Sequence, residues 1–499
     1  MEMKQELDMT QRLSMPMCQR VVNSDIAEDF TLPDYYPEIR RVLYVKEDIP
    51  VPARFTSGNK IDVNGVVDYT LVYVNSDGTV CSAPFSSEYA FSLPIEAPNE
   101  FELSEGVTVI AHTVADSSSV RVNAPRKIQI RSRLRSNVAA YGKMLCEDKF
   151  SGLENPSSVQ RLYGEAECAD IICESSDVIT LEDQYTLSSE DCSVALADAE
   201  LNIEDSRIEG EMIRVRGEAL VKMLIVCSGG VSETVLRKLP FEVETDFDGI
   251  AVDGDLLARV GGNVTDLTLN VDNGTVMIEA NLVIEMCMAQ NKAVKYTKDI
   301  YSTEQEADTV MRAYGLPVVL ENLNLSFSHN DKLELGEVNF PEGAQIAHTY
   351  STATVEQAAL EDGKYALRGS CKYNLICQSN GEYSNLEIKL PFKYEIEGDR
   401  EIDSFDASAR SMNCKVKNDG SFLNFDSEIH IACTLMGRAN TEMVEQVSFG
   451  EAREANANEW TVYYVTPEDD LWNIAKRYGV KESDVKGEPK SDRYVMIER

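Results

Sequence analysis

The sequence predicts a mostly β protein: three tandem β-rich repeats, each a sandwich or open barrel, followed by a small β-α-α-β module. Two observations support this fold class. Strand-like segments begin at Gly65, Gly217 and Gly369, and both intervals between these glycines are 152 residues. Helical periodicity is hard to find before residue 460, so the first 459 residues are most simply all β.

The segment after each glycine alternates between apolar and other residues. Because successive side chains of a strand point to opposite faces, this pattern is typical of a strand with one face on a core. The apolar positions are Val67, Tyr69, Leu71 and Tyr73, then Ala219, Val221, Met223 and Ile225, then Cys371, Tyr373, Leu375 and Cys377. The opposite face carries Asp68, Lys222 and Lys372 among its members.

Each glycine-led segment is followed by a turn signal and a returning strand. The turn signals end at Gly78, Gly230 and Gly381 and predict hairpins. The returning strands of the later two copies read LPFEVE and LPFKYE, whereas Glu88 stands near the position of their prolines in the first copy.

The length of the chain also favours several domains, because 499 residues exceed what one hydrophobic core usually supports. We assign repeats to residues 1–150, 151–305 and 306–450, a linker to 451–460 and the C-terminal module to 461–499.

The chain is strongly acidic. Its 85 Asp and Glu against 47 Lys and Arg leave a net charge of −38, and the residues from Trp460 onward contribute only one unit of it. A field of this sign repels phosphate backbones and anionic lipid, so nucleic acid is not an expected partner. The charge itself is most simply a solvated surface that protects strand edges from stray pairing, and a dedicated cation or partner surface is the alternative.

Neither cysteines nor histidines form a pattern that indicates a metal or a disulfide framework. The 12 cysteines are scattered, and several lie in strand-like runs where a thiol serves as a small apolar filler: Cys227, Cys371, Cys377 and Cys433. The four histidines lack the spacing of a zinc pair. No nucleophile and base pair or phosphate loop can be read either, so we expect a non-enzyme without cofactors.

The N-terminal residues MEMKQELDMTQRLSMPMCQR contain no continuous apolar stretch of the kind found in secretion signals. No segment approaches the roughly 18 apolar residues of a membrane span. These two features predict a cytoplasmic protein that does not insert into a membrane.

The segment DIAEDFTLPDYYPEIRRVL, from Asp25 to Leu43, combines an acidic stretch, a Pro-Asp step and an aliphatic pair near the start of the first repeat. In these features the repeats resemble the SPOCS domain of spore-coat morphogenetic proteins from endospore-forming bacteria. The similarity covers roughly residues 20 to 450 and lies in the pattern more than in the literal residues of the second and third copies.

The last 40 residues have a pattern of their own. Thr461–Val465 and Tyr494–Ile497 are predicted strands, and a short second helix is predicted near Glu482–Lys486. Between them, apolar residues at helical spacing, Leu471, Ile474, Ala475 and Tyr478, predict a helix that Gly479 ends. Thr466 followed by Pro467 is the expected start of this helix, and Asp469 is an alternative cap.

The run YYVTPEDDLWNIAKRYGV resembles a LysM module, and the match covers Val462 to Val480 almost without gaps. LysM modules commonly bind N-acetylglucosamine polymers through two loops. The resemblance assigns ligand or partner binding to Thr466, Pro467, Glu468, Asp469 and Asp470, and to Lys486, Gly487, Glu488 and Pro489. Glu468 replaces the usual Gly and Asp470 the frequent Thr, and these changes weigh against sugar binding.

The combination of SPOCS-like repeats with a terminal LysM-like module resembles the SipL and SpoVID type of coat protein. The resemblance implies a scaffold and adaptor that acts in the mother cell at the forespore surface. Its implied partners are the spore-coat morphogenetic ATPase and other coat proteins, and self-association through the repeats is a further expectation. The alternative is a protein of the spore cortex or cell wall that binds peptidoglycan or N-acetylglucosamine.

Overall fold

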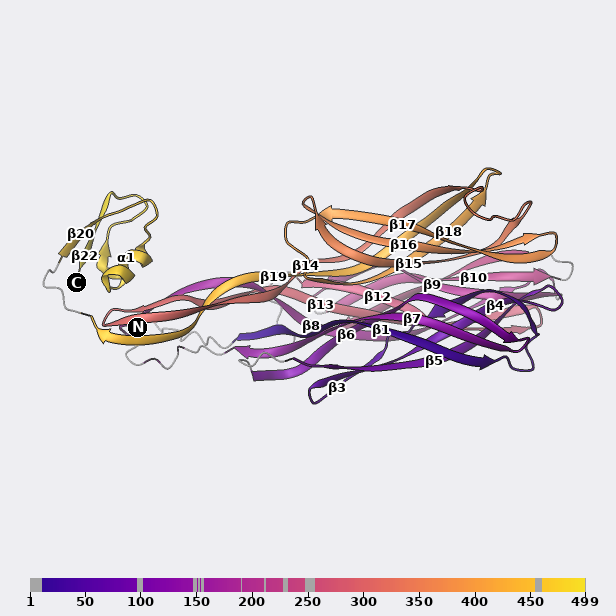
Figure 1. The fold of residues 1–499 in the computed structure, drawn as a ribbon, viewed down its shortest axis with the longest axis horizontal. Coiled ribbons are helices and arrows are strands. Elements are labelled where there is room, and N and C mark those ends of the chain that lie inside the picture. The colour runs from indigo at the N-terminus through magenta and orange to yellow at the C-terminus, as the bar shows by residue number, and fades with distance from the viewer. Residues whose placement is uncertain are drawn as a thin grey trace.

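A computed structural model describes residues 11–96, 102–146, 150, 153, 157–189, 191–210, 212–227, 232–246, 256–453 and 460–498. Across these residues the chain is almost entirely β-strand (Figure 1). The only helices among them are α1 (Leu471–Tyr478) and the short 3-10 helix η1 (Glu482–Asp484), both close to the C-terminus. The predicted mostly β fold class is therefore confirmed.

One arrangement of strands occurs three times along the chain. In each group the first, penultimate and last strands form one sheet with the last strand in the middle, and the strands between them form a second, meandering sheet. We call these groups unit 1, unit 2 and unit 3. In each unit the two sheets enclose a hydrophobic core of their own.

Unit 1 comprises β1 (Gln11–Thr31), β2 (Ile39–Asp48), β3 (Ala53–Ser57), β4 (Lys60–Asn75), β5 (Val80–Pro94), β6 (Glu102–Ala124) and β7 (Lys127–Cys146). Unit 2 comprises β8 (Val159–Thr186), β9 (Cys192–Glu209), β10 (Met212–Cys227), β11 (Ser232–Asp246), β12 (Leu256–Asp272) and β13 (Thr275–Ser302). Unit 3 comprises β14 (Gln305–Glu334), β15 (Gln345–Glu361), β16 (Lys364–Ser379), β17 (Glu382–Glu397), β18 (Ser404–Asn418) and β19 (Phe422–Ala452).

The three glycine-led segments form the central strands of the meanders, β4, β10 and β16. All twelve alternate apolar positions on these strands, from Val67 in the first to Cys377 in the last, are buried, as the period-two pattern predicts. Glu88 pairs with Val66 as Pro240 pairs with Glu218 and Pro391 with Ser370, so the first copy departs at the predicted place.

Each of these glycines lies under an aromatic ring from the returning strand. Gly65 pairs with Tyr89, Gly217 with Phe241 and Gly369 with Phe392. A Cβ added to any of the three would lie within 2.9 Å of that aromatic side chain, which explains why the position is glycine in every unit.

Two of the three predicted hairpin turns lie within the described residues. Asn380 and Gly381 have φ angles of 51° and 78° and connect β16 to β17 in a two-residue turn. Gly78, with a φ of 83°, lies in the turn between β4 and β5. The turn predicted to end at Gly230 lies outside the described residues.

The opposite faces of the central strands are also covered, because the three meanders pack against one another. β5 contacts β9, β11 contacts β15 and β17 contacts β2, so the units close into a ring. Val72, Leu224 and Ile376, one from each central strand, are buried together in this region. Asp68, Lys222 and Lys372 are accordingly partly buried and not fully solvated.

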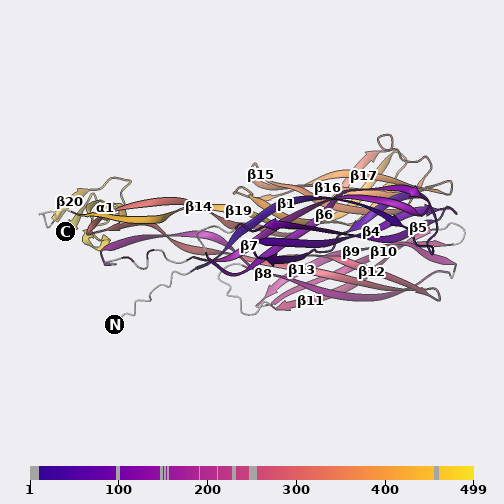
Figure 2. The same ribbon diagram turned by 60° about the horizontal axis from the view of Figure 1, so that its bottom comes forward.

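Four long strands extend beyond the ring as an arm. β8 and β13 have 28 residues each, β14 has 30 and β19 has 31. β14 contacts both β8 and β13, and the far end of this arm lies beside the C-terminal module (Figures 1 and 2). No helix in the described part of the chain is long and apolar enough to cross a membrane.

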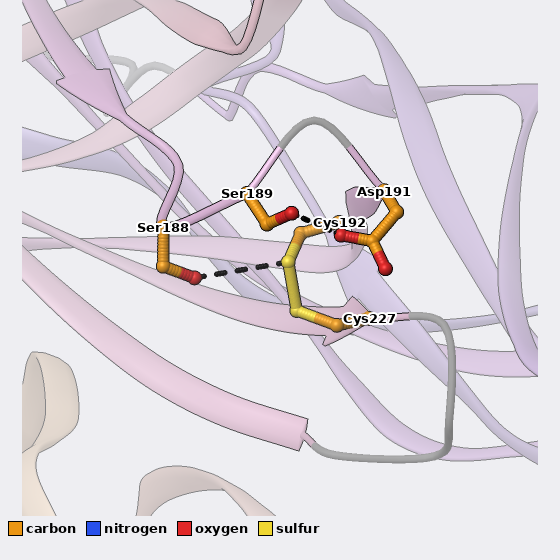
Figure 3. The surroundings of a disulfide bond; sticks show 5 residues. All are labelled: Ser188, Ser189, Asp191, Cys192 and Cys227. Carbon is orange, nitrogen blue, oxygen red and sulfur yellow. Dashed lines mark hydrogen bonds between the residues drawn. A yellow bond between two sulfur atoms is a disulfide. The ribbon is translucent and has the colours of Figure 1, made fainter.

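Among the cysteines whose side chains are described, Cys192 at the start of β9 and Cys227 at the end of β10 form a disulfide (Figure 3). The two residues are directly paired across the strands, and Ser188 Oγ lies 3.7 Å from Cys192 Sγ. The interpretation of Cys227 as a free apolar filler is therefore wrong, because strand register and not sequence spacing brings the two thiols together. Cys371, Cys377 and Cys433 are free and buried, as expected.

Candidate docking surface of the C-terminal module

The C-terminal module is a three-stranded sheet with one helix against it. β20 (Trp460–Tyr464) and β21 (Val485–Lys486) both pair with β22 (Tyr494–Glu498), which lies between them. Ile474 and Ala475 of α1 pack with Val495 and Ile497 of β22 in one buried cluster. The apolar residues at helical spacing thus form the face of α1 that packs on the sheet.

The helix begins later than both predicted caps, one residue after Asp469 and four residues after Thr466. Asp470 is the N-cap, and its carboxylate accepts a hydrogen bond from the Asn473 amide at 2.6 Å. The Asp469 carboxylate is already occupied, because it accepts hydrogen bonds from Tyr463 Oη, Thr466 Oγ1 and the Thr466 amide. The helix ends at Gly479, with a φ of 63°, as predicted.

A second set of side chains fastens the module to the end of the arm. Asp299 of β13 accepts hydrogen bonds from Trp472 Nε1 at 2.8 Å and from Lys476 Nζ at 2.7 Å. Tyr301, also on β13, donates to the Val480 carbonyl at 2.7 Å, and its ring meets that of Trp472 edge to face at 4.8 Å. We call Asp299, Tyr301, Trp472 and Lys476 the arm anchor.

The charge on Asp299 contributes to this anchor. Burial acts to raise the pKa of the Asp299 carboxyl, but the hydrogen bonds from Lys476 and Trp472 outweigh it, so the pKa lies below its usual value of 3.8. The carboxyl is therefore ionised at neutral pH and holds both donors. Trp472 packs in part against Tyr301, a residue from outside its own module.

The first predicted binding loop, residues 466–470, is largely exposed. Pro467 and Glu468 point to solvent, whereas the carboxylates of Asp469 and Asp470 hold the loop and the helix start in place. Asp469 and Asp470 thus have a structural role within the module, which the resemblance did not indicate.

The second predicted loop follows β21. Lys486 Nζ donates to the Ser483 carbonyl at 2.7 Å, and Gly487 has a φ of 119° that favours glycine. The Glu488 amide donates to Asp492 at 2.7 Å, and Pro489 is partly buried. These hydrogen bonds join the loop to residues next to it in the chain, so the second loop, like the first, is held by its own neighbours.

The most exposed apolar surface of the module is on its sheet and not in these loops. One face of the sheet carries Trp460, Val462, Tyr464, Tyr494 and Met496, with exposed fractions of 46%, 52%, 69%, 52% and 39%. Val462 pairs with Met496 and Tyr464 with Tyr494, so these side chains are neighbours. We call these five residues the outer sheet face.

The outer sheet face is not among the predicted binding residues, although the sequence carries a signal for it. Strands β20 and β22 carry apolar residues at both odd and even positions, and only one of their faces can lie on the helix. Lys486 and Glu498 lie at its margin and approach each other to 3.8 Å. A contiguous apolar patch with polar residues at its margin is a candidate interaction site.

No family model matches the chain, and no similar curated protein or solved structure was found. Within the part of the chain that the structure describes, there is no group of three or more His, Cys, Asp or Glu side chains that could hold a metal ion.

Proposed function

We propose that this protein is a non-enzymatic scaffold and adaptor in bacterial spore-coat assembly. The three units form the body, and the C-terminal module docks that body on a coat morphogenetic protein at the forespore surface in the mother cell. The resemblance of the repeats to SPOCS domains and of the last residues to LysM supports this setting.

One observation in particular supports an adaptor function for the C-terminal module. The module is fixed to the body through α1, so the helix side is occupied by the arm anchor, while five apolar side chains of the outer sheet face are left in solvent. Burying such side chains on a partner releases water from apolar surface, and aromatic residues contribute disproportionately to protein interfaces.

The charge distribution favours a different protein over a second copy of this chain. The body carries nearly all of the net charge of −38, so two copies repel each other at low ionic strength. A partner with an apolar patch surrounded by basic residues fits the nearly neutral outer sheet face and is attracted by the acidic body behind it.

The test is a binding measurement between the purified full-length chain and the coat morphogenetic ATPase. We expect Val462→Asp to weaken binding roughly 10- to 100-fold, because a buried interface charge without a partner costs on the order of 1.4 to 2.8 kcal/mol or more. Met496→Asp, on the neighbouring strand, is expected to have the same effect.

Glu468→Ala is the matched control, because Glu468 is exposed on the first loop of the same module. It is expected to leave binding to the ATPase unchanged. If Glu468→Ala abolished retention on insoluble peptidoglycan, and Val462→Asp left binding to the ATPase intact, the module would be a glycan-binding unit and the proposal would be wrong.

A further inference from the structure

The axis around which the three units close is lined by positions that are equivalent in the repeat. Lys46 of β2, Asp198 of β9 and Tyr350 of β15 follow one another at intervals of 152 residues. They pair with Thr70, Lys222 and Asn374 at matching places on the central strands. The ring is thus close to threefold in its backbone but not in its side chains.

The unlike side chains at this axis form a buried ionic cluster. Asp198 accepts from His348 Nε2 at 3.1 Å and lies 3.4 Å from Lys46 Nζ. Lys46, Asp198 and His348 are 8%, 2% and 2% exposed, and each belongs to a different unit. We call these three residues the axial cluster.

Further contacts join the three units around the axial cluster. Lys222 Nζ of unit 2 donates to the Thr349 carbonyl of unit 3 at 2.6 Å. The ring of Tyr44, from unit 1, stacks on that of Tyr350, from unit 3, with centroids 5.9 Å apart. Lys46 Nζ lies 5.5 Å from the centre of the Tyr350 ring.

The charges in the axial cluster depend on one another. Burial alone would raise the pKa of Asp198, but Lys46 and His348 outweigh it and lower the pKa to about 2. Burial would likewise lower the pKa of Lys46, and the carboxylates of Asp48 and Asp198 raise it instead. A buried charge is costly unless it is paired, so Asp198 without Lys46 would destabilise the ring, whereas Lys46 is also paired with Asp48 of its own strand at 2.9 Å.

The same broken symmetry occurs at a second contact between units. Ile110 of β6, Arg259 of β12 and Asp406 of β18 occupy equivalent registers, opposite Ala139, Cys287 and Thr434 of the neighbouring strands. Arg259 of unit 2 and Asp406 of unit 3 form an ion pair at 2.9 Å, with side chains 11% and 20% exposed. Identical residues at such positions would have placed like charges together.

We infer that the axial cluster closes the three units into one ring and fixes the order in which they adjoin. The Asp198 carboxylate meets both Lys46 and His348 only when unit 1 supplies the lysine, unit 2 the carboxylate and unit 3 the histidine. The inference concerns the body and is independent of the proposed adaptor role. It implies that the three units act toward partners as one rigid body and not as independent domains joined by linkers.

The test measures stability and ring closure separately. Arg40 of β2 and Glu382 of β17 are half-exposed and form an ion pair at 2.8 Å across the contact between units 1 and 3. In an Arg40→Lys background, a carbodiimide joins the new amine to Glu382, and mass spectrometry of the linked peptide reports closure. We expect Lys46→Met to lower the thermal midpoint by roughly 5 to 10 °C and to reduce the yield of this link several-fold.

Lys389→Met is the matched control, because Lys389 pairs with Glu356 at 3.0 Å on an exposed surface and is expected to shift the midpoint by less than about 1 °C. The double variant Lys46→Met with Asp198→Leu removes both ions, so we expect it to regain stability while the yield of the link stays low. The inference is wrong if Lys46→Met behaves like the control. It is also wrong if the double variant gives the link in wild-type yield.

Discussion

Replacing Gly369 with alanine is expected to destabilise the protein by about 4 kcal/mol or more, whereas the same change at Gly65 costs only about 1 to 2 kcal/mol. A Cβ on Gly369 would lie 2.2 Å from the backbone carbonyl oxygen of Thr354 and 2.4 Å from the Phe392 ring. The three nearest atoms at Gly65 all belong to the side chain of Tyr89 and none to the backbone, so a side-chain adjustment relieves the contact without a shift of the strands.

Urea unfolding of the two variants measures this difference directly. Gly217 resembles Gly369, because a Cβ there would lie 2.1 Å from the Asn202 carbonyl oxygen, and Gly217→Ala is expected to be equally severe. Gly336→Ala is the control, since a Cβ at Gly336 would meet no atom within 4 Å, and it should change the unfolding free energy by less than about 0.5 kcal/mol. If alanine at Gly65 and at Gly369 lowered the unfolding free energy equally, the explanation from the nearby Thr354 carbonyl oxygen at Gly369 would be wrong.

The second large effect is expected at the arm anchor, where Tyr301→Ala should release the C-terminal module from the arm. Tyr301 is fully buried, and removing a buried aromatic side chain costs about 3 to 5 kcal/mol. It lies on β13, so its removal leaves every residue of the module itself in place.

Tryptophan fluorescence reports this release. The chain has two tryptophans, Trp460 and Trp472, and Trp460→Phe leaves the buried Trp472 as the single probe. In that background Tyr301→Ala should shift the emission of Trp472 to longer wavelength, as expected for an indole that enters water. Emission that stays at the wild-type wavelength would show that Tyr301 does not hold the module.

The same probe tests the pH dependence of the anchor. Because the folded pKa of Asp299 lies below 3.8, its ionised form stabilises the docked state at all pH values above 3.8. That stabilisation is lost as the pH falls through the lowered pKa, so the emission should shift only in strongly acidic solution. In Asp299→Asn the acid shift attributable to this group should disappear.

Much of the fold could be predicted because the responsible signals are local in the sequence. The alternating apolar residues after Gly65, Gly217 and Gly369 are buried in every instance, and the hairpin at Gly381 forms where its turn residues indicate. The helix in the module also ends at the predicted Gly479.

What could not be predicted depends on contacts between residues far apart in the chain. Closure of the ring requires Lys46, Asp198 and His348 to meet, and no local pattern places them together. The disulfide between Cys192 and Cys227 likewise follows from the register of β9 on β10. The outer sheet face was not predicted although β20 and β22 carry apolar residues on both faces, because the sequence does not show which face packs on α1.

Imaging of the tagged full-length chain in sporulating cells tests the adaptor proposal most directly, by comparing wild type with the Val462→Asp and Met496→Asp double variant. The account predicts that wild type gathers around the forespore, while the double variant is produced at the same level and spreads through the mother cell. A double variant that still encircles the forespore would contradict it, because recruitment would then not depend on the outer sheet face.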